Sequence, residues 1–360
     1  KHNIPVTQTV MGYSTMKRDH SHYAGQIGAL GGKNTNLIAK QADLAIAIGT
    51  KLGDFTTGSW ANFENANFKL VSINVSRFDA NKHLAQAIVG DAKISLKDLS
   101  IALGDWRAGE DWNKKSQIEL AAWNDHIDKE SAPSNQEIPS YVQVIGAIYK
   151  NSDPSDIAVT AAGGLVGEVV QVWRPRELNT HETEWGFSCM SYEISGALGI
   201  KMANPNKEVI SFVGDGSYLL NNTDIYSSVI TKNKLIIIVC DNGGFAVINR
   251  LQLFKGGNEY NNLLKSSNTP GLVDVDFAKH AESMGAKSEH VNSISDLEEA
   301  FKRAKKSDVT YVISIKTHAY QWLEGSAFWD SPTLEIPTTN ENKEALKLYK
   351  EGKSKQRQGV

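Results

Sequence analysis

The sequence is poor in cysteine and has no long apolar run. Its 360 residues include only two cysteines, Cys189 and Cys240, too few for a disulfide framework, so we expect a reducing, cytoplasmic setting. No apolar stretch reaches the roughly 18 residues of a transmembrane helix, so no membrane span is expected. The net charge of −3 provides no basic surface, and we expect no nucleic-acid partner.

A dinucleotide-binding fingerprint is also missing. No G-x-G-x-x-G follows an apolar strand with an acidic residue about 20 positions further on. The stretch GQIGALGG at Gly25–Gly32 is rich in glycine, but no apolar strand precedes it. We interpret this stretch as a loop and the start of a helix.

The remaining composition is that of an ordinary globular chain, with 41% hydrophobic and 22% charged residues. Apolar runs alternate with helical patterns in both halves, which predicts the α/β class with parallel sheets. We expect a partial Rossmann-like middle domain at 1–125, a linker at 126–140, a parallel-sheet domain at 141–330 and a tail with a surface helix at 331–360. Because IPVTQT near Lys1 is typical of a strand inside a domain, we expect the first domain to be truncated at its N-terminus.

The strand candidates are short and strongly apolar. In the first half they are Ile4–Thr9, Ala42–Gly49, Phe68–Val75 and Ala87–Val89, and in the second Ile157–Thr160, Glu208–Val213, Leu235–Cys240 and Val309–Lys316. Helical periodicity predicts helices over Ile94–Leu103, Trp112–Glu130 and Tyr141–Lys150. Three of the strands in the second half end in turns rich in Gly or Asn. Ligands of parallel sheets bind beyond the carboxyl ends of the strands, so the site is expected there.

Two of these turns form a pair. Glu208–Val213 leads into Gly214-Asp215-Gly216-Ser217, and Leu235–Cys240 leads into Asp241-Asn242-Gly243-Gly244-Phe245. A strand–turn–helix–strand unit between them returns the chain beside its start, so the Asp215 carboxylate and the Asn242 amide can meet. These hard oxygen ligands suit Mg²⁺, with a backbone carbonyl near Gly244 as a third ligand.

The glycines of the first turn favour an anion beside that cation. Gly214 and Gly216 let backbone N–H groups approach a diphosphate closely. Ser217 and Tyr218 are predicted to begin a helix whose N-terminus favours negative charge.

This pair of turns resembles the cofactor motif of the thiamine-diphosphate enzymes. The resemblance implies thiamine diphosphate and Mg²⁺ as cofactors. It assigns metal binding to Asp215, Asn242 and Gly244, and cofactor binding to Gly163, Gly164, Leu165, Met190, Gly214, Asp215, Gly216, Ser217, Asn242, Gly244 and Phe245. Met190, in GFSCMSYEISGALGIKMANP, stands where the family carries an apolar residue under the cofactor; the alternative is a core methionine.

Within that family, several stretches look like the ring-opening hydrolases of inositol breakdown. They are ADLAIAIGTKLGDFTTGSW, VSINVSRFDANKH, GDGSYLLNNTDIYSSV and DNGGFAVINRLQ. Phe328-Trp329 stands where these hydrolases usually show a Trp pair. The resemblance implies that a small cyclic diketone, 3D-(3,5/4)-trihydroxycyclohexane-1,2-dione, is hydrolysed at a ring C–C bond to 5-deoxy-glucuronate.

The family also needs an activating glutamate from a separate pyrimidine-binding domain. No local motif replaces it, because we interpret Glu168, Glu184 and Glu193 as surface or cap residues. We therefore expect these 360 residues alone to be inactive. His181 and His318 are weak candidates for later proton transfers. The resemblance further implies a homo-oligomer, a dimer or a tetramer, with the cofactor at a subunit interface.

Two alternatives remain open at the level of sequence. One is an acetolactate synthase-like carboligase or decarboxylase, which would act on 2-keto acids instead of the cyclic dione. The other is a non-catalytic cofactor-binding subunit.

Overall fold

The computed structural model describes residues 1–134, 136–325 and 327–357, which divide into two units. Unit 1 contains Lys1–Val10, Asp19–Asn124 and the residues from Glu324 onward; unit 2 contains Met11–Arg18 and Asp125–Leu323. Residue 135 of the predicted linker, residue 326 of the predicted second domain and residues 358–360 of the predicted tail lie outside the described residues. The predicted domain limits stay a prediction.

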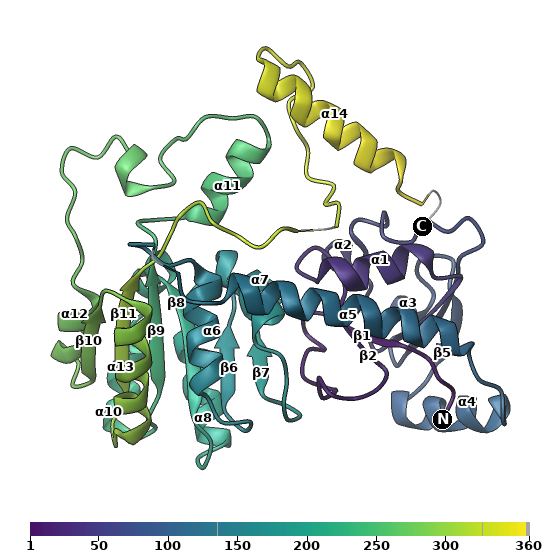
Figure 1. Cartoon of the computed structure of the whole chain (residues 1–360), viewed down its shortest axis with the longest axis horizontal. Helices are drawn as coiled ribbons and strands as arrows, with labels where there is room; N and C mark the ends of the chain where they lie inside the picture. The colour runs from purple at the N-terminus through teal and green to yellow at the C-terminus, as the bar shows by residue number, and fades with distance from the viewer. Residues whose placement is uncertain (135, 326, 358–360) are drawn as a thin grey trace. The chain divides into compact units, whose positions relative to one another are not determined.

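Unit 2 is built on a six-stranded sheet in the order β10-β11-β9-β8-β6-β7, and every neighbouring pair is parallel (Figure 1). The α/β class with parallel sheets is therefore confirmed. The strands are β6 (Ile157–Thr160), β7 (His181–Thr183), β8 (Val209–Gly214), β9 (Ile236–Asp241), β10 (Lys287–Val291) and β11 (Tyr311–Lys316).

Helices cover both faces of this sheet. Val213 and Val239 pack with Ile194 of α8, Ile225 of α10 and other apolar side chains of these helices on one face. Helix α6 contacts α7 and α13, and these two helices contact the strands of the sheet. The helices are α6 (Tyr141–Asn151), α7 (Gly163–Val172), α8 (Tyr192–Ala203), α9 (Asp215–Leu220), α10 (Asp224–Ile230), α11 (Ala246–Phe254), α12 (Phe277–Ser283) and α13 (Ile294–Lys306), with a 3-10 turn at Leu264–Ser266.

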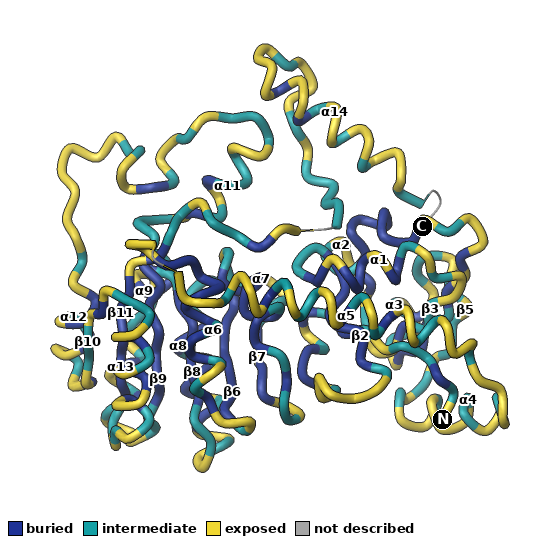
Figure 2. Tube along the Cα trace, in the orientation of Figure 1, coloured by how far each residue is buried: buried dark blue, intermediate teal, exposed yellow. Residues whose placement is uncertain are grey.

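Burial on both faces explains the apolar strands. Each residue of β9 is buried, and the central strands form the dark core in Figure 2. Alternate side chains of a strand point to opposite faces, so a strand covered on both sides needs apolar residues at nearly every position. Each fully buried Ile or Val side chain stabilises the fold by roughly 1.5–3 kcal/mol, as an upper bound.

The order of the strands creates a switch point. From β6 the chain adds β7 on one side, and then returns to place β8 on the other side of β6. The connections leave the carboxyl ends of β6 and β8 in opposite directions, which opens a crevice between them. The glycines that follow these two strands, Gly163 and Gly216, lie in the first turns of α7 and α9 and therefore at the switch point.

Unit 1 contains a smaller parallel sheet, β3-β4-β5, and a separate parallel pair, β1-β2. Its core contains Ile27, Trp60, Phe63 and Leu70. The strands are β1 (Val6–Gln8), β2 (Tyr23–Gln26), β3 (Leu44–Ile48), β4 (Lys69–Asn74) and β5 (Gln86–Val89). The helices are α1 (Lys33–Gln41), α2 (Asp54–Thr57), α3 (Arg77–Ala80), α4 (Ala92–Leu103), α5 (Glu110–Glu130, which continues into unit 2) and α14 (Asn340–Ser354).

The predicted apolar strands and the predicted helices, including the tail helix, are confirmed. Three strands were not predicted: β2, β7 and β10 are short or polar and lack an apolar run. Gly25, expected in a loop, lies in β2, although α1 does begin directly after Gly32. Helix α5 extends to Glu130, so the first part of the range expected as a linker is helical. None of the helices in the described part of the chain has the length and hydropathy to cross a bilayer.

Candidate functional site

The structure brings the two loop tips together. In the ladder between β8 and β9, Gly214 pairs with Cys240, so Asp215 emerges beside Asp241 and Asn242. Asp215 begins α9, two residues earlier than the helix start predicted at Ser217. Across the tips, a Cβ on Gly216 would lie 2.6 Å from the Phe245 ring, so this ring packs against the glycine. The paired tips therefore form one surface at the carboxyl edge of the sheet.

Two buried oxygens at these tips have no hydrogen-bond partner among the described residues. They are Oδ1 of Asp215 and Oδ1 of Asn242. The Nδ2 group of Asn242 donates a hydrogen bond to the Tyr141 hydroxyl at the start of α6, which fixes the orientation of the amide. Buried polar atoms are nearly always paired, so two unpaired acceptors on adjacent loops indicate a site for a cation.

The electrostatics of Asp215 support the same interpretation. Burial, followed by the negative charge of Asp241, raises the pKa of Asp215 above its usual range, while the backbone N–H groups of Gly244 and Gly216 oppose the shift. A divalent cation would offset this repulsion and favour the ionised carboxylate. The described residues contain no group of three or more His, Cys, Asp and Glu side chains that could hold a metal. A cation here would need mixed oxygen ligands, a donor set that suits Mg²⁺.

Gly244 has a backbone that only glycine adopts easily. Its φ angle is 142°, and a Cβ would lie 2.5 Å from the carbonyl oxygen of Asn262. An antiparallel bridge to Leu263 and the hydrogen bond from Phe245 N to Asn262 O, at 2.7 Å, hold this strand-like turn. The close approach explains the glycine, and the carbonyl of Gly244 stays the predicted third ligand.

The predicted turn at Gly163 and Gly164 lies at the carboxyl end of β6, as expected. Gly163 has a φ angle of 76° and begins α7, and Leu165 is buried within that helix. A Cβ on Gly164 would lie 2.1 Å from the Trp322 ring, so this indole covers the turn. The turn therefore depends on close packing as well as on backbone freedom.

Met190 precedes Ser191, whose φ angle of 75° marks a tight turn before α8. The backbone N–H of Ser191 donates to Ser217 Oγ at 2.6 Å, which brings Met190 next to the Gly214–Ser217 tip. Ser217 is itself buried, and its hydroxyl donates to Glu193 Oε2 at 2.8 Å. Its hydroxyl is thus engaged within the protein.

The two candidate histidines lie in different surroundings. His181 is the first residue of β7, opposite Ala158, so it lies away from the carboxyl end of that strand. Burial lowers its pKa to about 3, which keeps the ring neutral, and its Nε2 has no hydrogen-bond partner in the part of the chain that the structure describes. His318 follows β11, where its backbone N–H donates to Pro139 O at 2.9 Å. Of the two, the structure brings only His318 close to Asn242, across a shared cavity.

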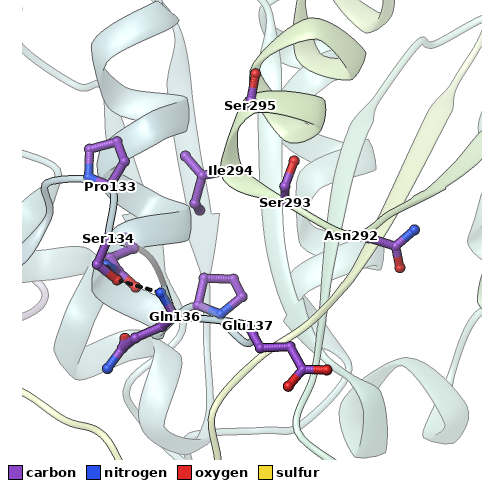
Figure 3. Close-up of a pocket in the computed structure, with 10 residues that line it drawn as sticks. Pro133, Ser134, Gln136, Glu137, Asn292, Ser293, Ile294 and Ser295 are labelled. Carbon is purple, nitrogen blue, oxygen red and sulfur yellow. Dashed lines mark hydrogen bonds between the residues drawn. The ribbon is translucent and has the colours of Figure 1, made fainter.

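That cavity, of about 570 Å³, lies beside the loop tip that carries Asn242. Asn242, Gly243, Thr317 and His318 contribute to its wall, together with Leu263, Leu264, Lys265 and Leu272–Asp274. Its size is that of a small-molecule pocket. A second hollow, of about 220 Å³, lies between residues of the stretches 133–134 and 136–143 and residues 292–295 at the start of α13 (Figure 3). None of the predicted site residues lines this second hollow, so we do not place the site there.

Sequence reasoning missed three residues of this region. Glu168 and Glu193, interpreted as surface or cap residues, are buried, with 3% and 1% of their surfaces exposed. Tyr141 orients Asn242 from an element distant in sequence. For Glu168 a signal existed, because it is the one charged residue in the apolar helix GGLVGEVVQV. A lone carboxylate in such a helix is either buried with polar partners or exposed at the edge of the apolar face. The sequence alone does not distinguish these two positions.

The segment that follows β11 runs over the carboxyl ends of the sheet (Figure 1). It begins where Thr317 N donates to Asp241 O at 2.7 Å, and it ends where Leu323 N donates to Glu168 Oε1 at 3.1 Å. Between these contacts, the Trp322 ring meets Tyr141 edge-on at 5.6 Å and lies under Arg250 at 5.1 Å. This segment, Thr317–Leu323, covers the β9-to-β6 part of the candidate site.

Comparison with known proteins identifies a family for both units. A family model described as "Thiamine pyrophosphate enzyme, C-terminal TPP binding domain" matches residues 161–315, and one described as "Thiamine pyrophosphate enzyme, central domain" matches residues 1–99. The first match contains the glycine turn after β6, the Met190 segment and both loop tips.

Relatives with curated names are similar along nearly the whole chain. A 3D-(3,5/4)-trihydroxycyclohexane-1,2-dione hydrolase of Geobacillus thermodenitrificans (strain NG80-2) is 35% identical over 94% of this chain and 57% of the relative. Proteins of the same name from Bacillus licheniformis and Clostridium tetani are 32% and 33% identical over 97% and 91% of this chain, and over 58% and 56% of their own length. The chain thus spans little more than half the length of these relatives. With both domain matches and this similarity, the chain belongs to the thiamine pyrophosphate enzyme family.

Proposed function

We propose that this chain binds thiamine diphosphate through Mg²⁺ and serves the hydrolysis of 3D-(3,5/4)-trihydroxycyclohexane-1,2-dione to 5-deoxy-glucuronate in inositol breakdown. The observation that carries the cofactor proposal is the pair of unpaired oxygens on Asp215 and Asn242 at adjacent strand ends. The substrate proposal is supported by the name of the relatives, which are 32–35% identical to this chain.

The residues of this chain have distinct parts in the proposed site. Asp215 and Asn242 would hold the cation, with the Gly244 carbonyl as third ligand, and the cation would offset the negative charge of the diphosphate. Gly214 and Gly216 leave room for a close approach to the backbone. Met190 and Leu165 provide apolar surface for the rings. When bound, thiamine diphosphate supplies an electron sink for cleavage of a C–C bond next to a carbonyl group.

The proposed reaction balances as a hydrolysis. Water is added across the ring bond between the two carbonyl carbons, so that one carbon becomes a carboxylate and the other becomes an aldehyde carbon with a new C–H bond. No oxidant or reductant is needed. Because water is a reactant, the site must admit it, while Thr317–Leu323 covers part of the site.

The activating glutamate belongs, in this proposal, to a pyrimidine-binding domain contributed at a subunit interface of a dimer or tetramer, in the cytoplasm. Support comes from the family resemblance and from the greater length of the relatives. The 360 residues alone should then bind the cofactor without turnover.

Two measurements test the proposal. Calorimetry should show thiamine diphosphate binding that needs Mg²⁺ and that weakens by about 100-fold or more in Asp215→Asn, since removal of a direct ligand should exceed the 10–100-fold effect of an outer-shell change. Turnover should then be assayed with a pyrimidine-binding domain supplied, on the cyclic dione and on a panel of 2-keto acids.

The outcomes separate the alternatives. Turnover of the dione supports the hydrolase, whereas turnover of 2-keto acids alone would replace it with the carboligase or decarboxylase. Turnover of the dione by the 360 residues alone would overturn the assignment of the activating glutamate. Binding that is indifferent to Mg²⁺ and to Asp215→Asn would remove the cofactor proposal itself.

A further inference from the structure

A buried carboxyl group, that of Glu193, lies beside the Gly214–Ser217 tip. Glu193 is the second residue of α8 and has 1% of its surface exposed. Burial raises its pKa, and the groups that oppose the shift are hydrogen-bond donors of Ser217 and of the backbone, not charged side chains. A buried carboxyl with only neutral partners destabilises a fold compared with an apolar side chain of similar volume. Stability alone therefore does not explain a glutamate here.

The contacts of Glu193 reach three separate segments. Its Oε1 accepts a hydrogen bond from Ala162 N at 3.3 Å, and its Oε2 accepts one from Ser217 Oγ at 2.8 Å. The same Ser217 Oγ accepts from Ser191 N at 2.6 Å. One side chain thus joins three turns that come from three different places in the sequence.

Each of these turns is adjacent to a predicted cofactor contact. Ala162 directly precedes Gly163, Ser191 directly follows Met190, and Ser217 ends the Gly214–Ser217 tip. The backbone of Glu193 is fixed as well, because its carbonyl oxygen accepts from Ser211 Oγ of β8 at 2.7 Å. The anchor on β8 gives the carboxyl a rigid base from which it sets the distances between the turns.

We infer that Glu193 is a positioning residue for cofactor binding. It fixes the relative placement of three segments: the turn at Gly163 and Gly164, the turn at Met190 and Ser191, and the Gly214–Ser217 tip. The inference rests on the proposed function, since these turns are assigned to thiamine diphosphate there. Glu193 itself is covered by protein, so it acts through the three turns and not on the reacting atoms. Its carboxyl group is needed because it offers two acceptor oxygens, one for Ala162 N and one for Ser217 Oγ.

The test uses Glu193→Ala, Glu193→Gln and Ser217→Ala in the full chain. The affinity for thiamine diphosphate with Mg²⁺ is expected to fall about 10–100-fold in Glu193→Ala, the range known for residues that support direct ligands. Glu193→Gln keeps an acceptor oxygen for one partner, so it should recover part of the loss. Adding Ser217→Ala to Glu193→Ala should have little further effect, because both changes break the same network.

Asp156→Asn is the matched control. Asp156 is also a buried carboxyl in unit 2, but it precedes β6 at the opposite edge of the sheet and pairs with Lys305 at 2.8 Å. This change should lower the stability of unit 2 and leave the cofactor affinity within about twofold of the wild type. If Glu193→Ala and Glu193→Gln behave like Asp156→Asn, Glu193 has only a structural role and the inference is overturned.

A second readout needs no cofactor. Hydrogen exchange of the unloaded chain should become faster together in the segments 161–165, 188–192 and 214–218 of Glu193→Gln, with the core strands unchanged. If the wild type does not bind thiamine diphosphate, the proposed function fails, and this exchange pattern still decides whether Glu193 couples the turns. Faster exchange in one segment alone, or throughout unit 2, would contradict the coupling.

Discussion

The six-stranded sheet of unit 2 and the three-stranded sheet of unit 1 share parallel pairing but differ in burial. Every residue of β9 is buried, whereas the ends of β3 are exposed, with 46% of Leu44 and 42% of Ile48 accessible. Helix α4 of unit 1 has no buried residue at all. Parallel strands with apolar sequences therefore occur in both sheets, but only the sheet of unit 2 contains a strand such as β9 that is buried at every position.

The two sheets also differ in the asparagines at their carboxyl ends. Asn74 ends β4, and its amide is satisfied at both atoms: Nδ2 donates to Thr50 O at 3.3 Å and Oδ1 accepts from Ser76 N at 2.9 Å. Asn242 follows β9, and its Oδ1 has no partner among the described residues. The first asparagine holds its own turn, and the second presents an oxygen to a ligand. Of these two asparagines at strand ends, only Asn242 has an unpaired buried acceptor among the described residues.

The largest expected effect concerns burial. Ile238→Ala removes a fully buried side chain of β9 and should lower the free energy of unfolding of unit 2 by about 2–5 kcal/mol. Ile48→Ala in β3 should cost less than about 1 kcal/mol, because that side chain is already partly in water. Urea denaturation, followed with probes in each unit, gives both values. Equal losses of unfolding free energy in Ile238→Ala and Ile48→Ala would show that the difference in burial does not determine the contribution of these side chains to stability.

The next effect separates the two asparagines. Asn242→Ala should weaken thiamine diphosphate binding with Mg²⁺ by about 100-fold or more, because it removes a proposed direct ligand, whereas Asn74→Ala should leave the affinity unchanged and lower the stability of unit 1 by about 1 kcal/mol. Calorimetry and thermal unfolding of both variants measure this. An unchanged affinity in Asn242→Ala would mean that its oxygen is not a ligand.

Glycines give a third contrast. Gly164→Ala would place a Cβ 2.1 Å from the Trp322 ring, and such overpacking should destabilise unit 2 by about 1–3 kcal/mol. Gly53→Ala in unit 1 meets nothing within 4 Å and should change stability by less than about 0.5 kcal/mol. Thermal unfolding of the two variants is sufficient. A neutral Gly164→Ala would show that Trp322 moves aside easily.

The smallest effect depends on pH. Burial raises the pKa of Glu168 to about 7, opposed by the hydrogen bond from Leu323 N and the charge of Arg250. Because the folded-state pKa is above the ordinary value, its contribution to stability is present at acidic pH and is lost as the pH rises through 7. Glu168→Gln should therefore flatten the pH dependence of unfolding and stabilise unit 2 by about 1–2 kcal/mol at pH 8.

Glu168→Gln has a clear control. Asp308 is exposed and pairs with Lys287, so Asp308→Asn should leave the slope between pH 5 and pH 8 as it is. Thermal unfolding at several pH values compares the two variants. A slope unchanged in Glu168→Gln would show that this carboxyl keeps an ordinary pKa despite its burial.

The sequence was sufficient to predict those features that depend on neighbouring residues alone. The runs VISFVG and IIIVCD predict β8 and β9, and the GDG and DNG turns that follow them predict where the loop tips lie. Parallel pairing then brings Asp215 and Asn242 together with no further information. The strand β10, with sequence KSEHV, was missed because an edge strand does not need an apolar run.

The contacts that hold the tips were beyond prediction for a physical reason. The site includes side chains from elements that are far apart in the chain, namely Tyr141, Glu193 and Trp322. Which face of each of these elements is buried depends on the tertiary fold and not on local sequence. The burial of Glu193 depends on β8 and on the turn after β6, neither of which is near it in sequence. Local sequence patterns indicate which residues form a helix or a strand. They do not indicate which distant turn a side chain will contact in the fold.

The ladder between β8 and β9 has one more consequence. Gly214 is held opposite Cys240 by strand pairing, and the helices α9 and α10 that connect the strands take no part in that register. Insertions or deletions within the connection can therefore accumulate during evolution without separating the two tips. A single-residue deletion inside either strand would instead displace its tip by about 3.3 Å and reverse its side chains.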